Sequence, residues 1–474
     1  MAFVDVPRVV AMQTEPRCCT AASAFAPLQF TRSGVAPRAA RTDFSAFPAA
    51  KAWLSSCSAG GRQEKDFEAL VDLKSGYPYW AVKNGLMYSF PKLARDETCE
   101  ALIVGGGISG SLIARALADA GIEVILVEQR DIGWGSTAAS TALLQYEIDT
   151  HMVDLARWFG EEQAVSCYRA CAEAIGELQT ICDEVAGVDF APQQSLYVAS
   201  HWLHRHRLHA EFEMRRRHGF DVEWLSAREL TERYAIRFPA AIVSEPAAQV
   251  DPYRLASKLL RKLRRRGVRV FDRTKVAALS VDAKGALMRT ADGLSIRARH
   301  AVVAAGYATQ EWLQQKVAVN HSSYAYVTDP LSAEVLGPWS RTLFWESARP
   351  YLYARTTRDH RFIVGGADDK VDIPARRDAR VAKKVRALEK RAAAIFGIGE
   401  LAADFAWAGT FAETADGLPF FGTHPQYGPR VIFAMAYGGN GITYSAIGAA
   451  LICALLRRRR HPLSHLFGFE RLRR

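Results

Sequence analysis

The clearest hydrophobic pattern of the chain lies between residues 100 and 128. Residues 100–105 (EALIVG) form a short apolar run of the length expected for a buried parallel strand. Residues 108–120 then carry helical periodicity, and Gly121 stands where a C-terminal cap glycine belongs. A second apolar run follows at 122–128 (IEVILVE). This order predicts one β-α-β unit in about 30 residues.

Later segments continue the alternation of helices and strands. Helical patterns cover 152–184 and 252–266, and the second opens at Asp251-Pro252 and ends at Gly267. Buried strands are predicted at 268–271 and 301–304. Alternating apolar and polar positions predict antiparallel strands near 194–199, 323–327, 351–354 and 362–365. A Gly-rich turn then leads into a final helix at 442–456.

These elements predict an α/β fold in which one Rossmann-like domain is assembled from discontinuous segments. An antiparallel, β-rich substrate domain is inserted between those segments. We assign residues 98–150, 245–310 and 405–456 to the first domain, and residues 151–244 and 311–404 to the second. The remaining assignments are a disordered or targeting-like tail (1–62), an aromatic-rich pre-domain segment (63–97) and a basic C-terminal tail (457–474).

Composition and charge narrow the functional classes. The 474 residues are 49% hydrophobic and 23% charged, which is typical of a globular protein and excludes collagen-like and coiled-coil classes. The formal charge of +11 is concentrated at the ends: residues 1–62 hold seven Lys/Arg against three Asp/Glu, and residues 454–474 hold seven against one. Because a nucleic-acid-binding fold needs a basic face in its body, we expect no nucleic-acid partner.

Several other signals set expectations for location and metals. The apolar run 442–456 is shorter than the ~20 residues that span a bilayer, so no transmembrane segment is expected. Eight cysteines without CxxC pairs fit a reducing compartment. We therefore expect a cytoplasmic protein, or an organellar matrix protein if residues 1–62 are a transit peptide. Four histidines at 201, 204, 206 and 209 alternate with arginines on a solvated helix, and no metal site is expected.

A glycine fingerprint joins the first predicted strand to its helix. Residues 105–110 (GGGISG) match GxGxxG, and Glu128 ends the next strand. Gly105 permits the tight turn, Gly107 lets the backbone approach a pyrophosphate, and Gly110 lets helix and strand pack closely. Glu128 would accept hydrogen bonds from a ribose and repel a 2′-phosphate. The pattern indicates FAD or NAD rather than NADP.

Several motifs in order resemble the D-amino-acid-oxidase-type FAD-dependent oxidoreductases, which include glycine oxidase and sarcosine oxidase-like proteins. The matching pieces are ALIVGGGISGSLIARALADAGIEVILVEQ, GSTAASTALLQYEID, AAQVDPYRLASKLL, AVVAAGYAT, YLYARTTRDHRFIVGG, DGLPFFG and YGGNGITYSAIGAAL. The resemblance implies that the discontinuous domain binds FAD. It also implies non-covalent binding, because Tyr351 and Leu352 stand where some relatives carry an attachment cysteine.

The resemblance further implies where FAD would be contacted. A loop at 136–143 would follow the ribityl chain, and the turn at 438–442 would lie beneath the flavin pyrimidine. The full set of predicted cofactor residues is Gly105, Gly107, Ile108, Ser109, Gly110, Glu128, Gln129, Ser136, Thr137, Ser140, Thr141, Ala142, Leu143, Val276, Ala305, Gly306, Gly438, Gly439, Asn440, Gly441 and Ile442.

The substrate side is predicted on one strand. Arg355 matches the strand arginine that pairs with a substrate carboxylate in glycine oxidase-like relatives, and its planar fork suits a carboxylate. Strand alternation would send Tyr351 and Tyr353 to the same face. The alternative is that Arg355 is a structural strand residue.

Together these features predict an FAD-dependent oxidoreductase that oxidises an amino acid or related amine at its C–N bond, by hydride transfer to flavin N5. Oxygen or a quinone would accept the electrons. Two alternatives stay open: a dehydrogenase of another small substrate such as glycerol 3-phosphate, or a non-catalytic flavin-binding subunit.

Overall fold

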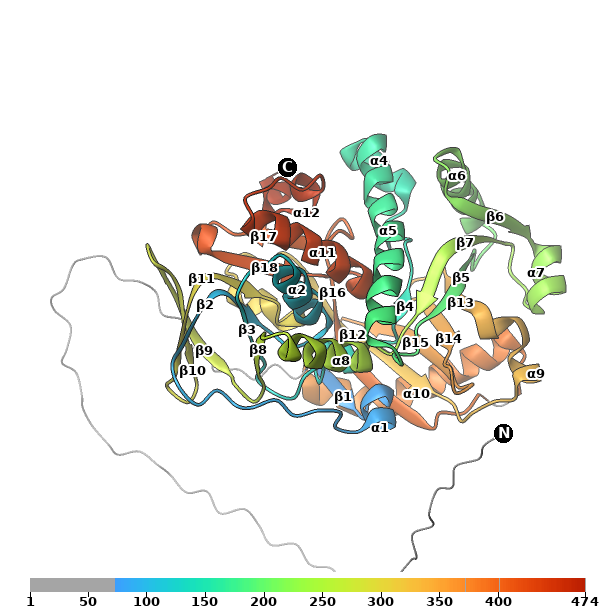
Figure 1. Cartoon of the computed structure of the whole chain (residues 1–474). Coiled ribbons are helices and arrows are strands. Elements are labelled where there is room, and N and C mark those ends of the chain that lie inside the picture. The colour runs from blue at the N-terminus through green and yellow to red at the C-terminus, as the bar shows by residue number, and fades with distance from the viewer. Residues whose placement is uncertain (1–72, 371, 400, 474) are drawn as a thin grey trace, which may run out of the picture. The chain divides into compact units, whose positions relative to one another are not determined.

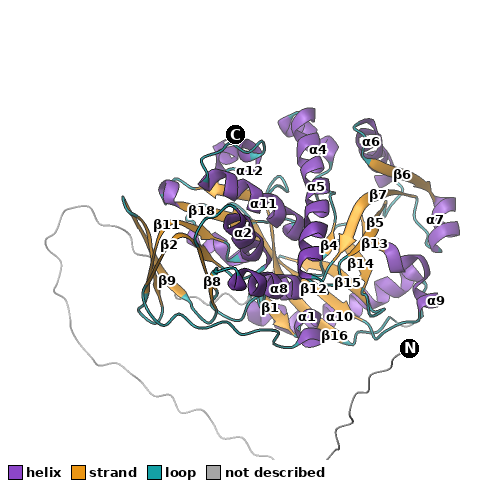
Figure 2. Ribbon diagram, in the orientation of Figure 1, coloured by secondary structure: helices purple, strands orange, loops and turns teal. Residues whose placement is uncertain are grey.

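The computed structural model describes residues 73–370, 372–399 and 401–473, all within the compact unit Gly61–Arg474. The predicted tail 1–62 lies outside the described residues. Two β-sheets organise the described chain, and helices α2 (Ile108–Asp119), α5 (Glu161–Val185), α8 (Pro252–Arg265) and α11 (Gly441–Leu456) pack together over the first of them (Figure 1). Figure 2 shows the strands of the two sheets on either side of α5.

The first sheet has eight strands and a parallel centre. Its strands in spatial order are β17 (Phe420–Thr423), β18 (Val431–Met435), β11 (Ser295–Val303), β2 (Glu97–Val104), β3 (Val124–Val127) and β8 (Arg269–Phe271), with the hairpin β9 (Val276–Asp282) and β10 (Gly285–Thr290) attached to β11. Pairing is parallel from β18 through β8. Ala101 and Ile103 of β2 pack against the helices, whereas Leu102 and Val104 face the core beneath the hairpin. Burial on both faces explains the unbroken apolar runs.

The second sheet has ten strands and is almost entirely antiparallel. In order they are β1 (Lys74–Gly76), β16 (Phe405–Glu413), β12 (Val319–Val327), β15 (Phe362–Asp369), β14 (Leu352–Thr356), β13 (Thr342–Glu346), β5 (Ala191–Val198), β7 (Ala240–Gln249) and β4 (Leu143–Leu144), with β6 (Asp221–Ser226) paired to β7. The β13–β5 pair is parallel. The α/β fold class and its Rossmann-type parallel centre are therefore as predicted.

The sheets divide the chain differently from the predicted boundaries. Residue 245 falls inside β7 and residue 405 begins β16, and both strands belong to the second sheet. The pre-domain segment also joins that sheet, because β1 pairs with β16. Local hydrophobic periodicity does not reveal which sheet a strand enters, so these boundaries could not be placed from the pattern.

The predicted C-terminal tail is not a solvated tail in its second half. Leu466, Phe467 and Phe469 are buried, and the Arg471 guanidinium donates to the carbonyls of Pro419 and Leu418 and pairs with Asp416. The few apolar residues stand close together within an arginine-rich stretch, so the sequence pattern did not predict their burial. The helical pattern expected over 152–184 forms two helices, α4 (Met152–Phe159) and α5, separated by Gly160 at φ +92°.

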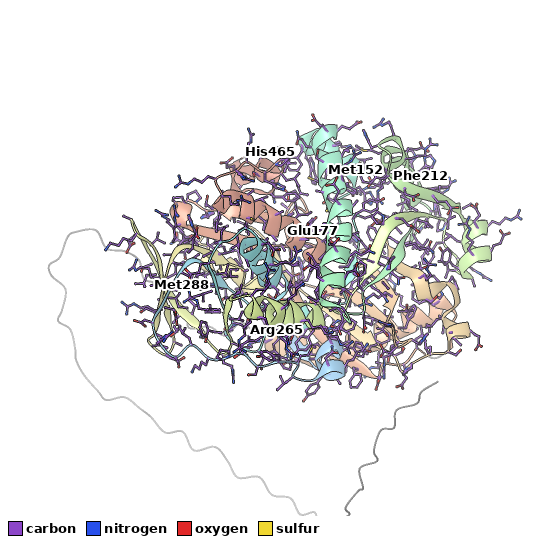
Figure 3. The ribbon with its side chains drawn as sticks, in the orientation of Figure 1. Met152, Glu177, Phe212, Arg265, Met288 and His465 are labelled. Atoms are coloured by element: carbon purple, nitrogen blue, oxygen red, sulfur yellow. The ribbon has the colours of Figure 1, made fainter. Side chains whose placement is uncertain are left out.

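Sequence periodicity also missed a long helix, α10 (Pro374–Phe396), which covers the second sheet through Val385, Leu388 and Phe396. Side chains fill separate cores at the two ends of the molecule. Met288 lies in the core under the β9–β10 hairpin, and Phe212 lies in a small cluster under α6 (His204–Arg217) (Figure 3).

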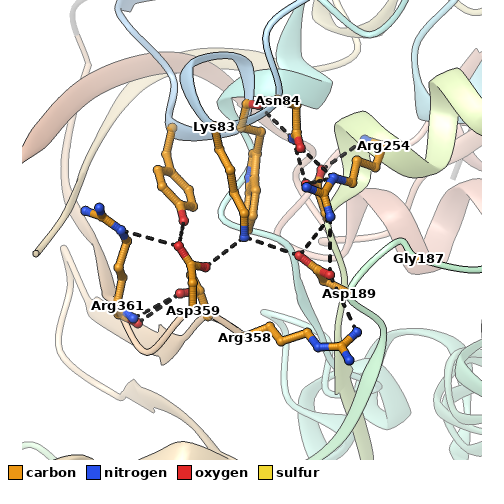
Figure 4. Close-up of polar contacts among 12 residues, drawn as sticks. Lys83, Asn84, Gly187, Asp189, Arg254, Arg358, Asp359 and Arg361 are labelled. Atoms are coloured by element: carbon orange, nitrogen blue, oxygen red, sulfur yellow. Dashed lines mark hydrogen bonds and ion pairs between the residues drawn. The ribbon is translucent and has the colours of Figure 1, made fainter. Parts of the chain in front are cut away.

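Helix α1 (Tyr79–Asn84) fastens the pre-domain segment to both halves of the fold. Figure 4 shows Lys83 between Asp189 and Asp359, with Nζ–Oδ distances of 3.2 and 2.7 Å. Asn84 donates to Asp251, the N-cap residue of α8. Burial alone would raise the pKa of Asp359, but hydrogen bonds from Lys83 and Tyr79 hold it below its usual range. This cluster of Lys83, Asn84, Asp189, Asp251 and Asp359 is called the α1 clasp below.

Removing the central cation of the α1 clasp tests its contribution. Lys83→Met should lower the free energy of unfolding by on the order of 1–2 kcal/mol, because two carboxylates lose a charged donor. The depressed pKa of Asp359 means that its stabilisation is complete above pH about 4 and is lost only at lower pH. Thermal unfolding should therefore show the same destabilisation at pH 7 and at pH 5. Lys92→Met, which removes an exposed pair with Asp292, is the control and should change little.

Candidate active site

A single cavity collects the loops that follow the carboxyl ends of the parallel strands. Gly105 follows β2, Glu128 follows β3, Thr274 follows β8 and Ala304 follows β11, and all four line it. Ligands of open α/β sheets bind at this edge, where neighbouring strands diverge. The cavity continues between the two sheets to residues of β12, β14 and β15.

The glycine fingerprint has the geometry that its sequence predicted. Gly105 has φ +116°, and a Cβ there would lie 2.3 Å from the carbonyl oxygen of Ala304. A Cβ on Gly110 would lie 1.9 Å from the Gly105 oxygen, so helix α2 can approach β2 only through glycine. Gly107 is the N-cap of α2 and has no capping side chain, which leaves the positive helix end facing the cavity.

Glu128 is presented to the cavity by main-chain donors. Its two carboxylate oxygens accept hydrogen bonds from the N–H groups of Gly106 and Arg130, at 2.8 and 2.9 Å. Burial raises the pKa of Glu128, and these N–H groups oppose that shift. The remaining lone pairs of the carboxylate are available to a diol such as a ribose.

Three side chains fix the segment at residues 135–143, which was expected as a loop but begins with one helical turn, α3 (Ser136–Ala139), and ends at the first residue of β4. It is still called the loop below. Consecutive carbonyls of this loop each accept a hydrogen bond: Ala139 from Trp407 (2.8 Å), Ser140 from Trp80 (2.7 Å) and Thr141 from Arg355 (2.6 Å). The donors come from three different elements, β16, α1 and β14. They hold the loop as one wall of the cavity, and we call them the three loop donors.

The N-terminus of α11 forms the opposite wall. Gly439, Asn440 and Gly441 line the cavity, and no side chain caps the helix. Asn440 instead donates to the carbonyl of Glu147, and the Gly439 N–H donates to Asp149 at 2.9 Å. An uncapped helix end at this position favours negative charge in the adjacent space.

The far end of the cavity is aromatic and acidic. Its lining residues there are Tyr307, Ser323, Trp345, Tyr351, Tyr353, Phe411, Glu147, Asp149 and Asp368. The rings of Tyr351 and Tyr353 lie 5.5 Å apart, and Trp345 stacks on buried Tyr197 at 3.7 Å. Tyr353 lies across Gly365, where any Cβ would come within 2.6 Å of its ring. Burial raises the pKa of Tyr353 to about 12, so its phenol stays protonated.

The structure corrects the role predicted for Arg355. Tyr351 and Tyr353 line the cavity, but Arg355 does not. Its guanidinium is only 2% exposed and donates to Thr141, Gln249, Val250 and Thr356, all through oxygen atoms of the protein. Burial lowers its pKa to about 10, which leaves it cationic at neutral pH. With four of its five N–H groups engaged, Arg355 positions the loop rather than a substrate carboxylate.

The other predicted site residues lie together. Every predicted cofactor residue except Gly110 lines the cavity, and Gly110 serves the close packing of α2 against β2. Sequence reasoning missed the far-end residues Asp149, Ser323, Trp345, Asp368 and Phe411. Asp149 ends the quoted loop motif QYEID, and Phe411 alternates with Trp407 and Gly409 on one strand face, so both carried a weak signal.

The residues present fit a bound FAD. The glycine turn brings the backbone at the N-terminus of α2 to the cavity, where a pyrophosphate could lie, although the Ile108 N–H there already donates to the Thr137 hydroxyl. Glu128 offers acceptors to a ribose. The Ser136 hydroxyl is buried against the cavity without a hydrogen-bond partner, as expected for a group that contacts a polar ligand chain.

Fold and site together define a flavin-dependent oxidoreductase. The family model described as FAD dependent oxidoreductase (DAO) matches residues 100–455, and the chain belongs to this family. Glycine oxidase of Bacillus subtilis is 25% identical over 382 residues, covering 78% of this chain and 96% of the relative. Gamma-glutamylputrescine oxidoreductase of Escherichia coli is 25% identical over 394 residues, covering 80% and 88%.

Solved structures show the same fold. The crystal structure of glycine oxidase from Geobacillus kaustophilus superposes with a TM-score of 0.66 at 19% identity, covering 78% of this chain and 98% of that one. In the described part of the chain, no helix combines the length and apolarity needed to cross a membrane. The same described residues hold no cluster of three or more His, Cys, Asp or Glu side chains suited to a metal ion.

The fingerprint can be tested by filling the space above Gly107. Gly107→Val should give folded protein with little bound flavin, because the branched side chain would occupy the space beside the α2 N-terminus. Flavin content is measured from the absorbance of the purified protein. Gly176→Val, at an exposed position of α5 with open space around it, is the matched control. Full flavin content in Gly107→Val would show that the cofactor lies elsewhere.

Substitution of Arg355 tests whether it is a structural residue or binds a substrate carboxylate. Arg355→Leu should destabilise the fold by roughly 2–5 kcal/mol and reduce flavin content, because several buried carbonyls lose their donor. Arg358→Leu changes an exposed arginine of the same hairpin and should alter neither property. Unfolding midpoints and flavin content measure both effects. A variant with native stability and flavin, but selectively lost activity on carboxylate substrates, would restore the original assignment.

Proposed function

We propose that this chain oxidises the C–N bond of a small amine or amino acid. The observation that carries the proposal is that one cavity joins the FAD fingerprint to an aromatic far end. The named activities of the relatives, on glycine and on gamma-glutamylputrescine, support an amino acid or amine as substrate. Bound FAD would supply the acceptor for a hydride, at its N5 atom.

The residues of the chain would position the substrate and exclude water. Tyr307, Tyr351 and Tyr353 offer ring faces around the far end, and each keeps its phenol proton because burial raises its pKa. The uncapped N-terminus of α11 would stabilise negative charge that develops beside it. The substrate loses a hydride and a proton, and water then converts the imine to a carbonyl compound and ammonia or an amine.

The far end argues against a phosphorylated substrate. A phosphate ester calls for arginine or lysine donors. Among the described residues that line the cavity, the two cations are Arg130 and Lys275. Both lie by Glu128: Arg130 is two residues away, and Thr274, next to Lys275, donates to the Glu128 carbonyl. This places them at the end opposite the aromatic residues.

An anaerobic substrate screen tests the proposal. The yellow holoenzyme is mixed with individual amino acids, primary amines and N-methyl amines, and flavin absorbance near its visible maximum is followed. We expect bleaching by at least one nitrogen compound and none by glycerol 3-phosphate. Bleaching by glycerol 3-phosphate alone would favour the phosphate-ester alternative. Bleaching only by dithionite would indicate a non-catalytic flavin-binding subunit.

A further inference from the structure

The charges around the far end of the cavity have one sign. Seven charged residues line the whole cavity, and three of them (Glu128, Arg130 and Lys275) form its nucleotide end. The other four are acidic: Glu147, Asp149, Glu311 and Asp368. Arg355, the residue expected to supply a positive charge there, is occupied by protein oxygens. A substrate carboxylate would therefore meet repulsion without a compensating partner in the lining.

The acidic residues differ in how far the protein already satisfies them. Glu147 accepts from Ser244 and lies 3.7 Å from Arg215, so its charge is largely balanced. Asp149 accepts from the Gly439 N–H. Asp368 and Glu147 each line the cavity with one carboxylate oxygen, Oδ1 and Oε2, buried without a hydrogen-bond partner. Of the two, Glu147 has a nearby counter-charge in Arg215, whereas among the described residues Asp368 forms no ion pair. Such an acceptor is costly unless a ligand donates to it.

Aromatic faces surround the same acceptor. Tyr351, Tyr353, Asp149 and Asp368 line the same cavity. Burial raises the pKa of each phenol, and both carboxylates add to that shift. The Tyr353 hydroxyl lies 3.3 Å from Ser323, and Ser323 lines the cavity too. Ring faces and carboxylates together are the chemistry that binds ammonium groups. Phe411 adds a further apolar surface.

We propose that this end of the cavity binds its substrate through an ammonium group, held by Asp368 and the faces of Tyr351 and Tyr353, and needs no substrate carboxylate. The substrate class is then a primary or secondary amine cation with an apolar or cationic remainder. This inference rests on the proposed oxidation of a C–N bond and names the substrate class of the same site.

One arginine near the far end of the cavity, Arg349, partly offsets the negative charge there. Arg349 is exposed and packs over the Tyr351 ring, 4.5 Å from its centroid. Asp149 and Glu413 are among the charges that raise its pKa, although burial opposes them. Glu413 lies 3.4 Å from the His321 ring nitrogen and has a partner of its own. Asp149 and Asp368, which both line the cavity, still outnumber Arg349, so the local field favours a cation. Removing Arg349 should strengthen cation binding rather than weaken it.

Binding of an unreactive cation tests the proposal without turnover. Benzamidine is a cation with N–H donors that has no C–H bond on its amidine carbon and so cannot lose a hydride, and phenylacetate is an aromatic anion of similar size. Each is titrated into the holoenzyme while tryptophan fluorescence and flavin absorbance are followed. We expect saturable binding of the cation and much weaker binding of phenylacetate. Asp368→Asn should weaken cation binding about tenfold or more, and Arg349→Ala should strengthen it several-fold.

Controls separate a local effect from damage to the fold. Asp378→Asn removes an exposed carboxylate of α10 and should leave cation affinity unchanged. Flavin content and unfolding midpoint should be native in Asp368→Asn, and Arg349→Ala gives a second reading of opposite sign at an exposed site. Tighter binding of phenylacetate than of the cation, or unchanged affinity in both variants, would overturn the proposal.

Matched substrate pairs distinguish failure of the proposed ammonium site from failure of the proposed C–N oxidation. Benzylamine is compared with phenylglycine, and 1,4-diaminobutane with ornithine, in the anaerobic assay. Bleaching by the amine of each pair supports both ideas. Bleaching only by the amino acid of each pair would keep C–N oxidation and overturn the ammonium-only site. If no nitrogen compound reacted but the cation still bound through Asp368, the proposed function would fail while the binding site stood.

Discussion

Three consecutive main-chain carbonyls, at residues 139–141, carry the constraint on which the cavity depends. Each is held by a different side chain, Trp407, Trp80 or Arg355, and each donor belongs to a different element. A connecting segment is ordinarily among the more mobile parts of a fold. Here the position of residues 139–141 is set by Trp407 of β16, by Trp80 of helix α1 and by the buried guanidinium of Arg355. The second sheet and helix α1 thereby hold the wall along which a cofactor would lie.

Local patterns predicted the nucleotide end of the cavity well. The GxGxxG turn, the apolar runs of β2 and β3 and the Asp251-Pro252 start of α8 each depend on neighbours in sequence. Gly105 and Gly110 are required by contacts within a single β-α-β unit. A single sequence can reveal such features because each of these residues is required by contacts with residues close to it in the chain.

The far end could not be predicted in the same way. Alternation was expected to put Tyr351 and Tyr353 on the face of Arg355. The two tyrosines line the cavity and Arg355 does not, because its guanidinium donates to protein oxygens instead. Those partners lie on segments more than a hundred residues away. An arginine is chemically suited to both a carboxylate and a set of carbonyls. Only the tertiary arrangement decides between them, and the same holds for the burial of Arg471.

The α1 clasp also has a consequence for the order in which the molecule is assembled. Tyr79 donates a hydrogen bond to Asp359, which lies 280 residues further along the chain, and Lys74 of β1 pairs with Gly409 of β16. Strand β1 and helix α1 are synthesised early, but their partners Asp359 and Gly409 are synthesised much later. Until then Trp80 lacks its place in the core, and the loop at 139–141 lacks a donor. Contacts of such long range are entropically late, so the wall of the cavity closes only when nearly the whole chain is present.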